Sequence, residues 1–495
     1  MNRNMLIVRT STMILAFFIL LQGLTPAIPS QKIINKIPLI KEQNYSKSNH
    51  KFSENIDYSN VTEILKLNDE GDHFPCGYEL WCYHAILTLE NGEKWDAAAT
   101  FVYFMNKTFR KYSDGLSWLR IRHWNHEINK YYDYFQYDPF PGVFTTTKNV
   151  VNISYYNSSI TGLYPDYHVY CEDHKYNITS DLNLHAISYP CWLFNQTTNR
   201  KLPWGFTGWA KVYFVPLMQV NGTITINGTT YNASGHAYFE HDFAWVDFTD
   251  PFSIHSPEDF IVSAALTLKS AKWLIKESLK NKLKEPLSFH RSNDYMFGWC
   301  WSWIVFENNW SMVIFRPTIL GMSKGRIPVF VYLTKDQQNF YEIGNIYWNN
   351  KKEKYIKKAD IYIPADFEIA AYRDDMEFKF SFTATTENTE LYSKDIAPSN
   401  KRESCTFYTC GVVKGYYKDD EDNVTLNGSY AIEQSRWLSK FDRHRSLDVE
   451  VLIPLHGIGI IIRRINHYLS VERFFKFTIK PRFELQFYIR NSPSQ

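Results

Sequence analysis

The clearest pattern along this chain is the alternation of apolar and polar residues over residues 219–245, QVNGTITINGTTYNASGHAYFEHDFAW. A period of two, interrupted by Asn-Gly at Asn221 and Asn227, predicts successive antiparallel strands joined by tight turns. The last predicted strand carries Glu240 and His241, which are polar residues among apolar neighbours. We therefore expect a sheet wall that contains a polar pair.

A second alternating segment, GWCWSW, occupies residues 298–303. In a strand, alternation places Trp299, Trp301 and Trp303 on one face and Cys300 on the other. Three indoles in a row can line a pocket for a large apolar ligand. Burial in the core of a barrel is the alternative for these tryptophans.

The β pattern begins at Phe74, where FPCGYELWCYHAILTLENGEKWDAAATFVYF predicts two strands joined by a turn at residues 90–92. The first of these strands places Trp81 and Tyr83 on one face and His84 on the other. Residues 31–70 are polar and rich in Asn, Lys and Ser, which indicates a leader or spacer and not a core.

One segment, residues 263–287, breaks the β pattern. Apolar residues recur there at close to helical spacing among lysines: Leu266, Trp273, Leu274 and, less regularly, Ile275 and Leu279. The pattern predicts an amphipathic helix that ends at Pro286, within a helical insertion over about residues 255–287. We expect this helix to pack on the barrel surface; a lid over a barrel mouth is the alternative.

The length of 495 residues and the 17% aromatic content favour two large β domains. We expect the first over residues 71–325 and the second over residues 326–495. The segment GHAYFE (residues 235–240) is matched by GSYAIE (residues 428–433), with Gly and Glu five residues apart in both. This echo indicates a duplicated β unit.

The net charge is only +2, and the chain contains no long uninterrupted run of Lys or Arg. Such a composition does not favour a nucleic-acid partner. The oligomeric state cannot be inferred from the sequence.

Residues 1–30 combine Arg3 and Arg9, an apolar run from Met13 to Leu21, and the small residue Ala27. These features predict a secretory signal peptide, because the apolar run is too short to span a bilayer. We expect a secreted or extracytoplasmic protein with no integral membrane segment once the signal is removed; an uncleaved anchor is the alternative. Glycosylation sequons support export: Asn44, Asn60, Asn106, Asn152, Asn157, Asn177, Asn195, Asn221, Asn227, Asn232, Asn309, Asn423 and Asn427.

The chain has seven cysteines. In an exported protein their spacing favours three local disulfides that leave Cys300 unpaired: Cys76 with Cys82, Cys171 with Cys191, and Cys405 with Cys410. None of the cysteine spacings matches a zinc site, so we expect no metal.

Three ordered motifs between residues 79 and 309 resemble those of the carotenoid hydratase (hydroxyneurosporene synthase, CrtC) and AttH-like lipocalin family. ELWCYHAILTLENGEKW is similar to the family's opening strand pair, E-W-W-Y-Y-x-G-x-L. The segment of residues 219–245 resembles the family strand that ends in W-x-D-H-x-W-G, and GWCWSWIVFENN resembles its W-x-W strand. The resemblance implies an all-β protein with two lipocalin-like antiparallel β-barrel domains and a helical insertion.

Members of that family handle apolar polyene or polyketide substrates without a metal or redox cofactor, so the resemblance implies none here. It places the carboxylate and histidine of D-H-x-W-G on Glu240 and His241. The family's Trp and Gly are replaced by Phe243 and Ala244, and its Asp by Glu, which makes catalysis less certain than the fold. The candidate ligand-binding residues are Trp81, Tyr83, Tyr238, Phe243, Trp299, Trp301 and Trp303.

Two functions from different classes remain open, with a third of lower weight. The first is a carrier of an apolar small molecule such as a lipid, isoprenoid or pigment. The second is a cofactor-independent hydratase, isomerase or cyclase that uses Glu240 and His241 as an acid/base pair, although neighbouring strand residues point to opposite faces unless a bulge intervenes. The third is a carbohydrate-binding surface glycoprotein. Asp247 and Asp250 are candidate carboxylate partners for Glu240.

Overall fold

The computed structural model divides the chain into two compact units, residues 1–47 and 48–495, and every described residue belongs to the second. The described residues are 61–73, 76–106, 111–124, 131–138, 144–205, 208–246, 256–282, 288–289, 297–319, 322–335, 340–359, 361–386, 389–392, 403–438, 446–455, 458–463, 467–468 and 484–489.

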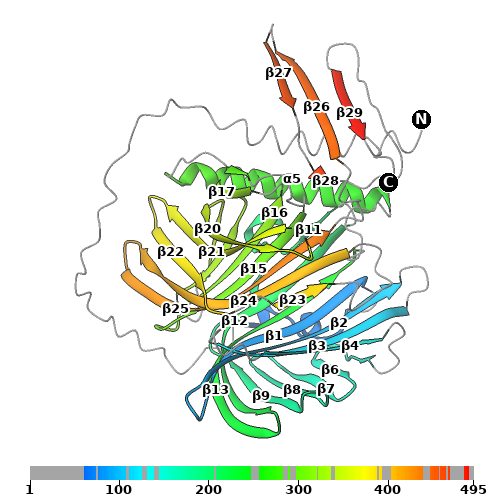
Figure 1. Cartoon of the computed structure of the whole chain (residues 1–495), viewed down its shortest axis with the longest axis vertical. Coiled ribbons are helices and arrows are strands. Elements are labelled where there is room, and N and C mark those ends of the chain that lie inside the picture. The colour runs from blue at the N-terminus through cyan, green and yellow to red at the C-terminus, as the bar shows by residue number, and fades with distance from the viewer. Residues whose placement is uncertain are drawn as a thin grey trace. The chain divides into compact units, whose positions relative to one another are not determined.

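The first sheet has 13 antiparallel strands, in the order β4-β3-β2-β1-β13-β12-β9-β8-β7-β6-β5, with β10 and β11 paired to β12. Its strands are β1 (Tyr78–Leu89), β2 (Lys94–Asn106), β3 (Lys111–His123), β4 (Tyr131–Asp138), β5 (Phe144–Thr145), β6 (Val151–Tyr155), β7 (Ser158–Leu163), β8 (Asp166–Asp173), β9 (Ile178–Ala186), β10 (Cys191–Trp192), β11 (Leu202–Trp204), β12 (Gly208–Ile226) and β13 (Thr229–Ala244). The sheet curves around its own core (Figure 1).

The hairpin of β12 and β13 turns at Asn227-Gly228, as predicted. Both residues have positive φ, 52° and 81°, which a two-residue hairpin turn requires and which Asn and Gly tolerate best. The turn predicted at Asn221 is wrong, because β12 runs through this residue and pairs on both sides, with β9 and β13.

The second sheet has 12 antiparallel strands, in the order β14-β17-β20-β21-β22-β24-β25-β15-β16-β18-β19, with β23 paired to β24. Its strands are β14 (Ser288–Phe289), β15 (Phe297–Phe306), β16 (Ser311–Ile319), β17 (Met322–Arg326), β18 (Phe330–Thr334), β19 (Phe340–Gly344), β20 (Tyr347–Ile356), β21 (Ile361–Tyr372), β22 (Glu377–Ala384), β23 (Thr389–Tyr392), β24 (Glu403–Lys418) and β25 (Asn423–Leu438). Two large antiparallel sheets confirm the predicted all-β, lipocalin-like fold class.

The tryptophan strand β15 belongs to the second sheet, because it pairs with β25 and β16. The strands therefore divide between the sheets at the segment that separates β13 from β14, and not at residue 326 as the predicted domains had it. Four further strands form a small separate sheet: β26 (Ser446–Leu455), β27 (Ile458–Arg463), β28 (His467–Tyr468) and β29 (Glu484–Ile489).

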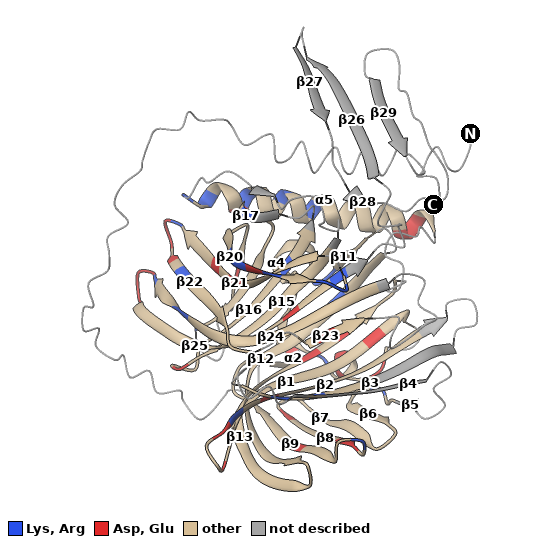
Figure 2. Ribbon diagram, viewed as in Figure 1, with Lys and Arg blue, Asp and Glu red and all other residues tan. Residues whose placement is uncertain are grey.

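The predicted helix is α5 (Pro257–Lys280). It begins earlier than predicted, because Ser256 accepts a hydrogen bond from the Asp259 amide and Pro257 occupies the first turn, and it ends before Pro286. Trp273 stacks on Phe330 at 5.5 Å, whereas Ile275 and Leu279 are exposed, so their assignment to the buried face is wrong. Figure 2 shows basic residues along this helix.

None of the helices that the structure describes is long and apolar enough to span a membrane.

Two short helices, α2 (Val61–Ile64) and α3 (Leu67–Glu70), lie within the predicted leader. Leu65 packs into the core of the first sheet, and the Trp192 indole donates a hydrogen bond to the Ile64 carbonyl at 2.7 Å. The end of the segment predicted as a spacer is thus part of the fold, because its few apolar residues find a core in tertiary contacts. A further helix is α4 (Asn195–Thr198).

The echo between Gly235–Glu240 and Gly428–Glu433 has a structural counterpart. A Cβ atom on Gly235 would overlap the Ile86 carbonyl oxygen of β1, and one on Gly428 would overlap the Val305 carbonyl oxygen of β15. In both sheets, this glycine lets its own strand lie close to a paired strand: β13 lies close to β1, and β25 lies close to β15. The two strands consequently present their glutamates at equivalent positions.

Three of the four apolar clusters formed by the described residues fill and join the two large sheets. One fills the interior of the first sheet and includes Trp81 and Phe239, and a second fills the interior of the second sheet and includes Trp348. The third lies between the sheets and includes Phe214 and Tyr332. The outward face of β13 therefore packs against the second sheet and not against solvent.

Candidate functional site

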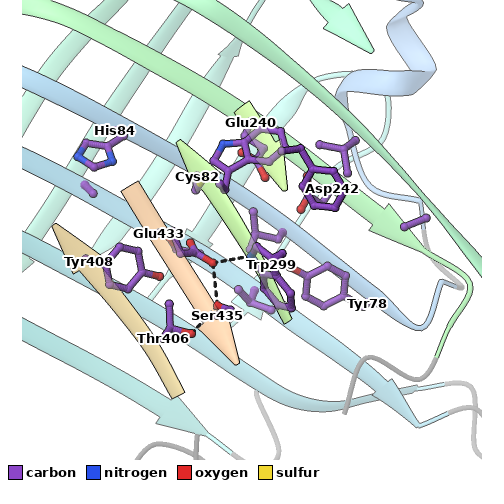
Figure 3. A pocket seen from close by; sticks show the side chains of 18 of the residues that line it. Tyr78, Cys82, His84, Glu240, Asp242, Trp299, Thr406, Tyr408, Glu433 and Ser435 are labelled. Atoms are coloured by element: carbon purple, nitrogen blue, oxygen red, sulfur yellow. Dashed lines mark hydrogen bonds between the residues drawn. The ribbon is translucent and has the colours of Figure 1, made fainter. Parts of the chain in front are cut away.

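A cavity of about 260 Å³ lies between the two sheets. The first sheet contributes side chains from β1, β2 and β13, and the second contributes side chains from β15, β24 and β25 (Figure 3). Both walls come from strands with period-two alternation, so every second residue of each strand faces the cavity. Its polar lining includes the carboxyl groups of Glu240, Asp242 and Glu433.

Glu240 and Asp242 are two residues apart on β13, so they share the cavity face. Their carboxyl groups hydrogen-bond to each other, and the Tyr238 hydroxyl donates to Glu240. Burial raises the pKa of Glu240 to about 7, and burial followed by the neighbouring Glu240 raises the pKa of Asp242 well above its usual range. The pair therefore retains a proton at neutral pH.

Glu433 faces the cavity from β25 in the second sheet. It accepts hydrogen bonds at 3.0 Å from the Trp299 indole and from the Ser435 hydroxyl (Figure 3). Burial raises the pKa of this carboxyl group as well. The cavity thus holds carboxyl groups on both walls.

Aromatic rings line the cavity from both sheets. Trp299, Trp301, Trp303 and Tyr238, all predicted ligand-binding residues, line this cavity. Tyr238 and Trp301 lie 6.2 Å apart between ring centroids, one on each wall. Rings around buried carboxyl groups form a site that excludes water and stabilises positive charge.

Some buried polar atoms of this lining have no hydrogen-bond partner among the described residues. They include the Trp301 Nε1 donor and the Asp242 Oδ1 acceptor. Buried polar groups are normally paired, so a partner from a bound ligand or water is expected at each. The site can therefore orient a molecule that is mainly apolar and carries a polar group.

The predicted pair of Glu240 and His241 is separated by the strand geometry. Glu240 faces the cavity between the sheets, whereas His241 is fully buried in the interior of the first sheet, where its Nε2 lies 2.8 Å from Glu79 Oε1. No bulge intervenes, since both residues keep regular register with β1. The structure does not bring the two side chains to one site.

Three other predicted ligand-binding side chains also lie in that interior. Trp81 stacks on His241 at 4.7 Å, Phe243 stacks on His73 at 3.5 Å, and the Tyr83 hydroxyl lies 2.9 Å from the Ser180 hydroxyl. Trp81 and Phe243 thus contact the His241 cluster, whereas Tyr83, whose hydroxyl bonds within this interior, also lines the cavity as predicted. Burial lowers the pKa of His241, whereas the hydrogen-bond contacts of Glu79 with His241 and His73 outweigh burial and lower the pKa of Glu79 to about 2.

A buried ionic cluster adjoins one end of the cavity. Asp96 lies 3.0 Å from Arg120 and 2.8 Å from Arg122. Arg122 also donates to the Tyr408 carbonyl and to the Cys410 thiol of the second sheet, at 3.1 and 2.8 Å. The cluster joins the two sheets beside the pocket residue His84.

No disulfide joins any of the seven cysteines, all of which lie among the described residues, so the three predicted disulfides are wrong in this structure. Cys405 and Cys410 lie five residues apart in the same strand, β24, which separates their Cα atoms by roughly 16 Å, whereas a disulfide needs about 4.4–6.8 Å. Cys76 precedes β1, whereas Cys82 lies within this strand, and no disulfide joins them. Cys300 is unpaired and buried, as predicted.

Sequence reasoning missed Asp242 and Glu433. The period of two could have found Asp242, which shares the face of Glu240, and the echo already aligned Glu433 with Glu240. Asp247 and Asp250, predicted as partners of Glu240, lie outside the described residues.

Neither protein-family models nor curated protein sequences match this chain. Among solved structures it is similar to an AttH-type protein of Nitrosomonas europaea, with 12% identity, a TM-score of 0.49, and coverage of 74% of this chain and 95% of the other. Kievitone hydratase of Nectria haematococca has 12% identity and a TM-score of 0.44, covering 73% and 90%. CghA with Sch210972 has 9% identity and a TM-score of 0.40, covering 73% and 89%. The architecture described above rests on the strand pairing of this chain itself.

Proposed function

We propose that this protein binds an apolar small molecule, such as a lipid, isoprenoid or polyene, between its two sheets and acts on it as a cofactor-independent hydratase, isomerase or cyclase. The observation that carries this proposal is the hydrogen-bonded pair of Glu240 and Asp242 in an aromatic cavity. A simple carrier of apolar molecules gains nothing from such a pair, because burying carboxyl groups costs free energy.

The chemistry follows from the protonated carboxyl group. The Glu240–Asp242 pair donates a proton to one carbon of an alkene, and the carbocation formed at the other carbon lies among aromatic rings such as Trp299 and Trp301. Loss of a neighbouring C–H proton to the carboxylate gives an isomer. Addition of water, or of a second alkene of the same molecule, gives a hydrated or cyclised product after a proton returns to the carboxylate.

The decisive test begins with native mass spectrometry and organic extraction to recover the ligand. The recovered compound is then incubated in D2O with the parent protein and with Glu240→Gln and Asp242→Asn. Carbon protonation predicts deuterium on carbon with the parent protein and a loss of at least about 100-fold in both variants. Glu390→Gln is the matched control, because Glu390 accepts from Tyr392 as Glu240 does from Tyr238 but is exposed.

Ligand binding without deuterium incorporation by the parent protein would leave a carrier and remove the enzyme. An empty protein that binds glycans would remove both. Equal activity of Glu240→Gln and Glu390→Gln would show that the carboxyl pair takes no part.

Membership of the carotenoid hydratase and AttH-like family is part of this proposal and is supported by the three sequence motifs. In this protein the acid of that motif acts with Asp242, and His241 has a separate role.

We also propose that the protein is exported and glycosylated. The N-terminal apolar run supports export, and nine sequon asparagines are exposed: Asn152, Asn157, Asn177, Asn195, Asn221, Asn227, Asn232, Asn423 and Asn427. N-terminal sequencing of protein from the culture medium should place the mature start near Ala27. Retention of Met1 in a cell-associated protein would contradict cleavage.

A further inference from the structure

A second group of donor atoms converges in the interior of the first sheet, on the opposite face of β13 from the cavity. His73 Nδ1 and His241 Nε2 each lie 2.8 Å from Glu79 Oε1. The three donor atoms all lie within 4.8 Å of one another. Glu79 and His241 are fully buried, and the His73 side chain is 13% exposed.

The orientation of His241 is fixed by the backbone. Its Nδ1 lies 3.0 Å from the Asp69 carbonyl oxygen, which can only accept, so Nδ1 carries a proton. In the neutral ring Nε2 then presents a lone pair to a carboxylate oxygen. This arrangement requires a positive centre between Nε2 and Glu79, either an additional proton or a metal ion. A metal-bound histidine commonly donates its other N–H to a backbone carbonyl in this way.

More polar contacts converge on Glu79 than its carboxylate group can accept as hydrogen bonds. Its Oε1 lies near the His73 amide, His73 Nδ1 and His241 Nε2, and its Oε2 lies near the His73 amide, the Tyr103 hydroxyl and the Cys76 thiol. These six contacts compete for roughly four lone-pair positions of a carboxylate. The single Tyr103 hydroxyl proton is moreover shared between Glu79 and Asp72. A cation held by His73 Nδ1, His241 Nε2 and Glu79 Oε1 replaces two of these contacts and so relieves the crowding.

We propose that His73, Glu79 and His241 bind a divalent transition-metal ion, zinc in the first instance. Two imidazole nitrogens and one carboxylate oxygen form a ligand set that zinc uses in proteins. Tetrahedral bonds of about 2.0–2.1 Å separate neighbouring donors by roughly 3.3 Å, so the 2.8 Å contacts need to widen by only about half an ångström.

The other three-donor group among the described residues, His84, Asp96 and Cys410, is a poorer candidate. Two guanidinium groups already contact Asp96, and their charge opposes a cation there.

The proposed zinc site links the segment that precedes β1 to the first sheet. His73 lies between α3 and β1, whereas Glu79 is in β1 and His241 in β13. Phe243 stacks on His73 and Trp81 stacks on His241, which holds both imidazoles in place. Bound zinc therefore stabilises the docking of α2 and α3 into the first sheet. This departs from the expectation of no metal, which considered only cysteine spacing, whereas these ligands lie 6 and 162 residues apart.

The test measures zinc in the full-length protein after stripping with a chelator and reconstitution with Zn²⁺. Mass spectrometry of metal content is expected to give about one zinc per chain, and titration against a competing chelator gives the affinity. His73→Gln should weaken zinc binding at least about 100-fold, because even supporting residues of metal sites contribute 10–100-fold. His73→Asp, which restores an oxygen ligand, should recover part of it.

Cys410→Ser is the matched control, because it alters the other three-donor group and should leave the zinc affinity unchanged. Zinc should raise the melting temperature of the parent and of Cys410→Ser, but not that of His73→Gln. A protein that takes up no zinc, or one in which His73→Gln binds as tightly as the parent, overturns the proposal. Loss of zinc in Cys410→Ser alone would overturn it too. If His73→Gln fails to fold, the affinity and melting temperature of His73→Asp decide.

Discussion

Replacing Glu240 by Gln should make the protein more stable at alkaline pH while abolishing catalysis. The pKa of Glu240 is raised from 4.5 to about 7, so the folded state keeps a proton that the unfolded state has released. Stability therefore falls as pH rises from the unfolded pKa to the folded pKa. Between pH 5 and pH 7 this amounts to 2 pH units at about 1.36 kcal/mol each, or roughly 3 kcal/mol.

The glutamine side chain can still accept from Tyr238 and hydrogen-bond to Asp242, but it does not titrate. Burial first, and then the charge of Glu240, raise the pKa of Asp242; the substitution removes only the second cause, which lowers the pKa of Asp242 and so acts in the same direction as the gain. We expect the variant to gain about 3 kcal/mol relative to the parent between pH 5 and pH 8.

The assay is urea unfolding at pH 5 and pH 8 for the parent, Glu240→Gln and the exposed control Glu390→Gln. Titrating groups other than Asp242 are common to all three proteins and cancel in the differences. A parallel pH dependence of parent and Glu240→Gln would refute the argument, because Glu240 would then be ionised in the folded state at little cost. Destabilisation of Glu240→Gln at both pH values would show instead that Glu240 is a structural acceptor.

Three further predictions concern the fold. Gly235→Ala and Gly428→Ala should each destabilise the protein by about 1–3 kcal/mol in urea unfolding, since each Cβ would overlap a carbonyl oxygen of the neighbouring strand; a neutral effect would contradict this close approach. Asp96→Asn should cost about 3–5 kcal/mol by the same measurement, because it leaves Arg120 and Arg122 buried without their counter-ion, and a loss below about 1 kcal/mol would mean that water reaches the cluster. In denaturant without reductant, a thiol reagent should react with seven thiols per chain; five or fewer would reveal a disulfide.

Local sequence predicted much of the fold. Period-two alternation located strands such as β13 and β15, the Asn227-Gly228 pair marked the hairpin turn between β12 and β13, and lysines among spaced apolar residues marked α5. These signals are local, because the face that a residue occupies on a strand or helix depends only on how many residues separate it from its neighbours on the same element. The same parity places Trp299, Trp301 and Trp303 on one face, and it separates Glu240 from His241.

Tertiary structure decided which faces meet. Pairing of β15 with β25 carries the tryptophans into the second sheet, and packing of the two sheets then brings Glu433 and Trp299 to the cavity that Glu240 and Asp242 line. The interior cluster likewise joins His73, Glu79 and His241 from distant parts of the chain. Such contacts depend on long-range strand register and sheet packing, which no local periodicity contains. The sequence thus identified Glu240 as a candidate, and its period of two places Asp242 on the same face, but only the tertiary structure supplied the cavity, the facing Glu433 and the raised pKa of Glu240.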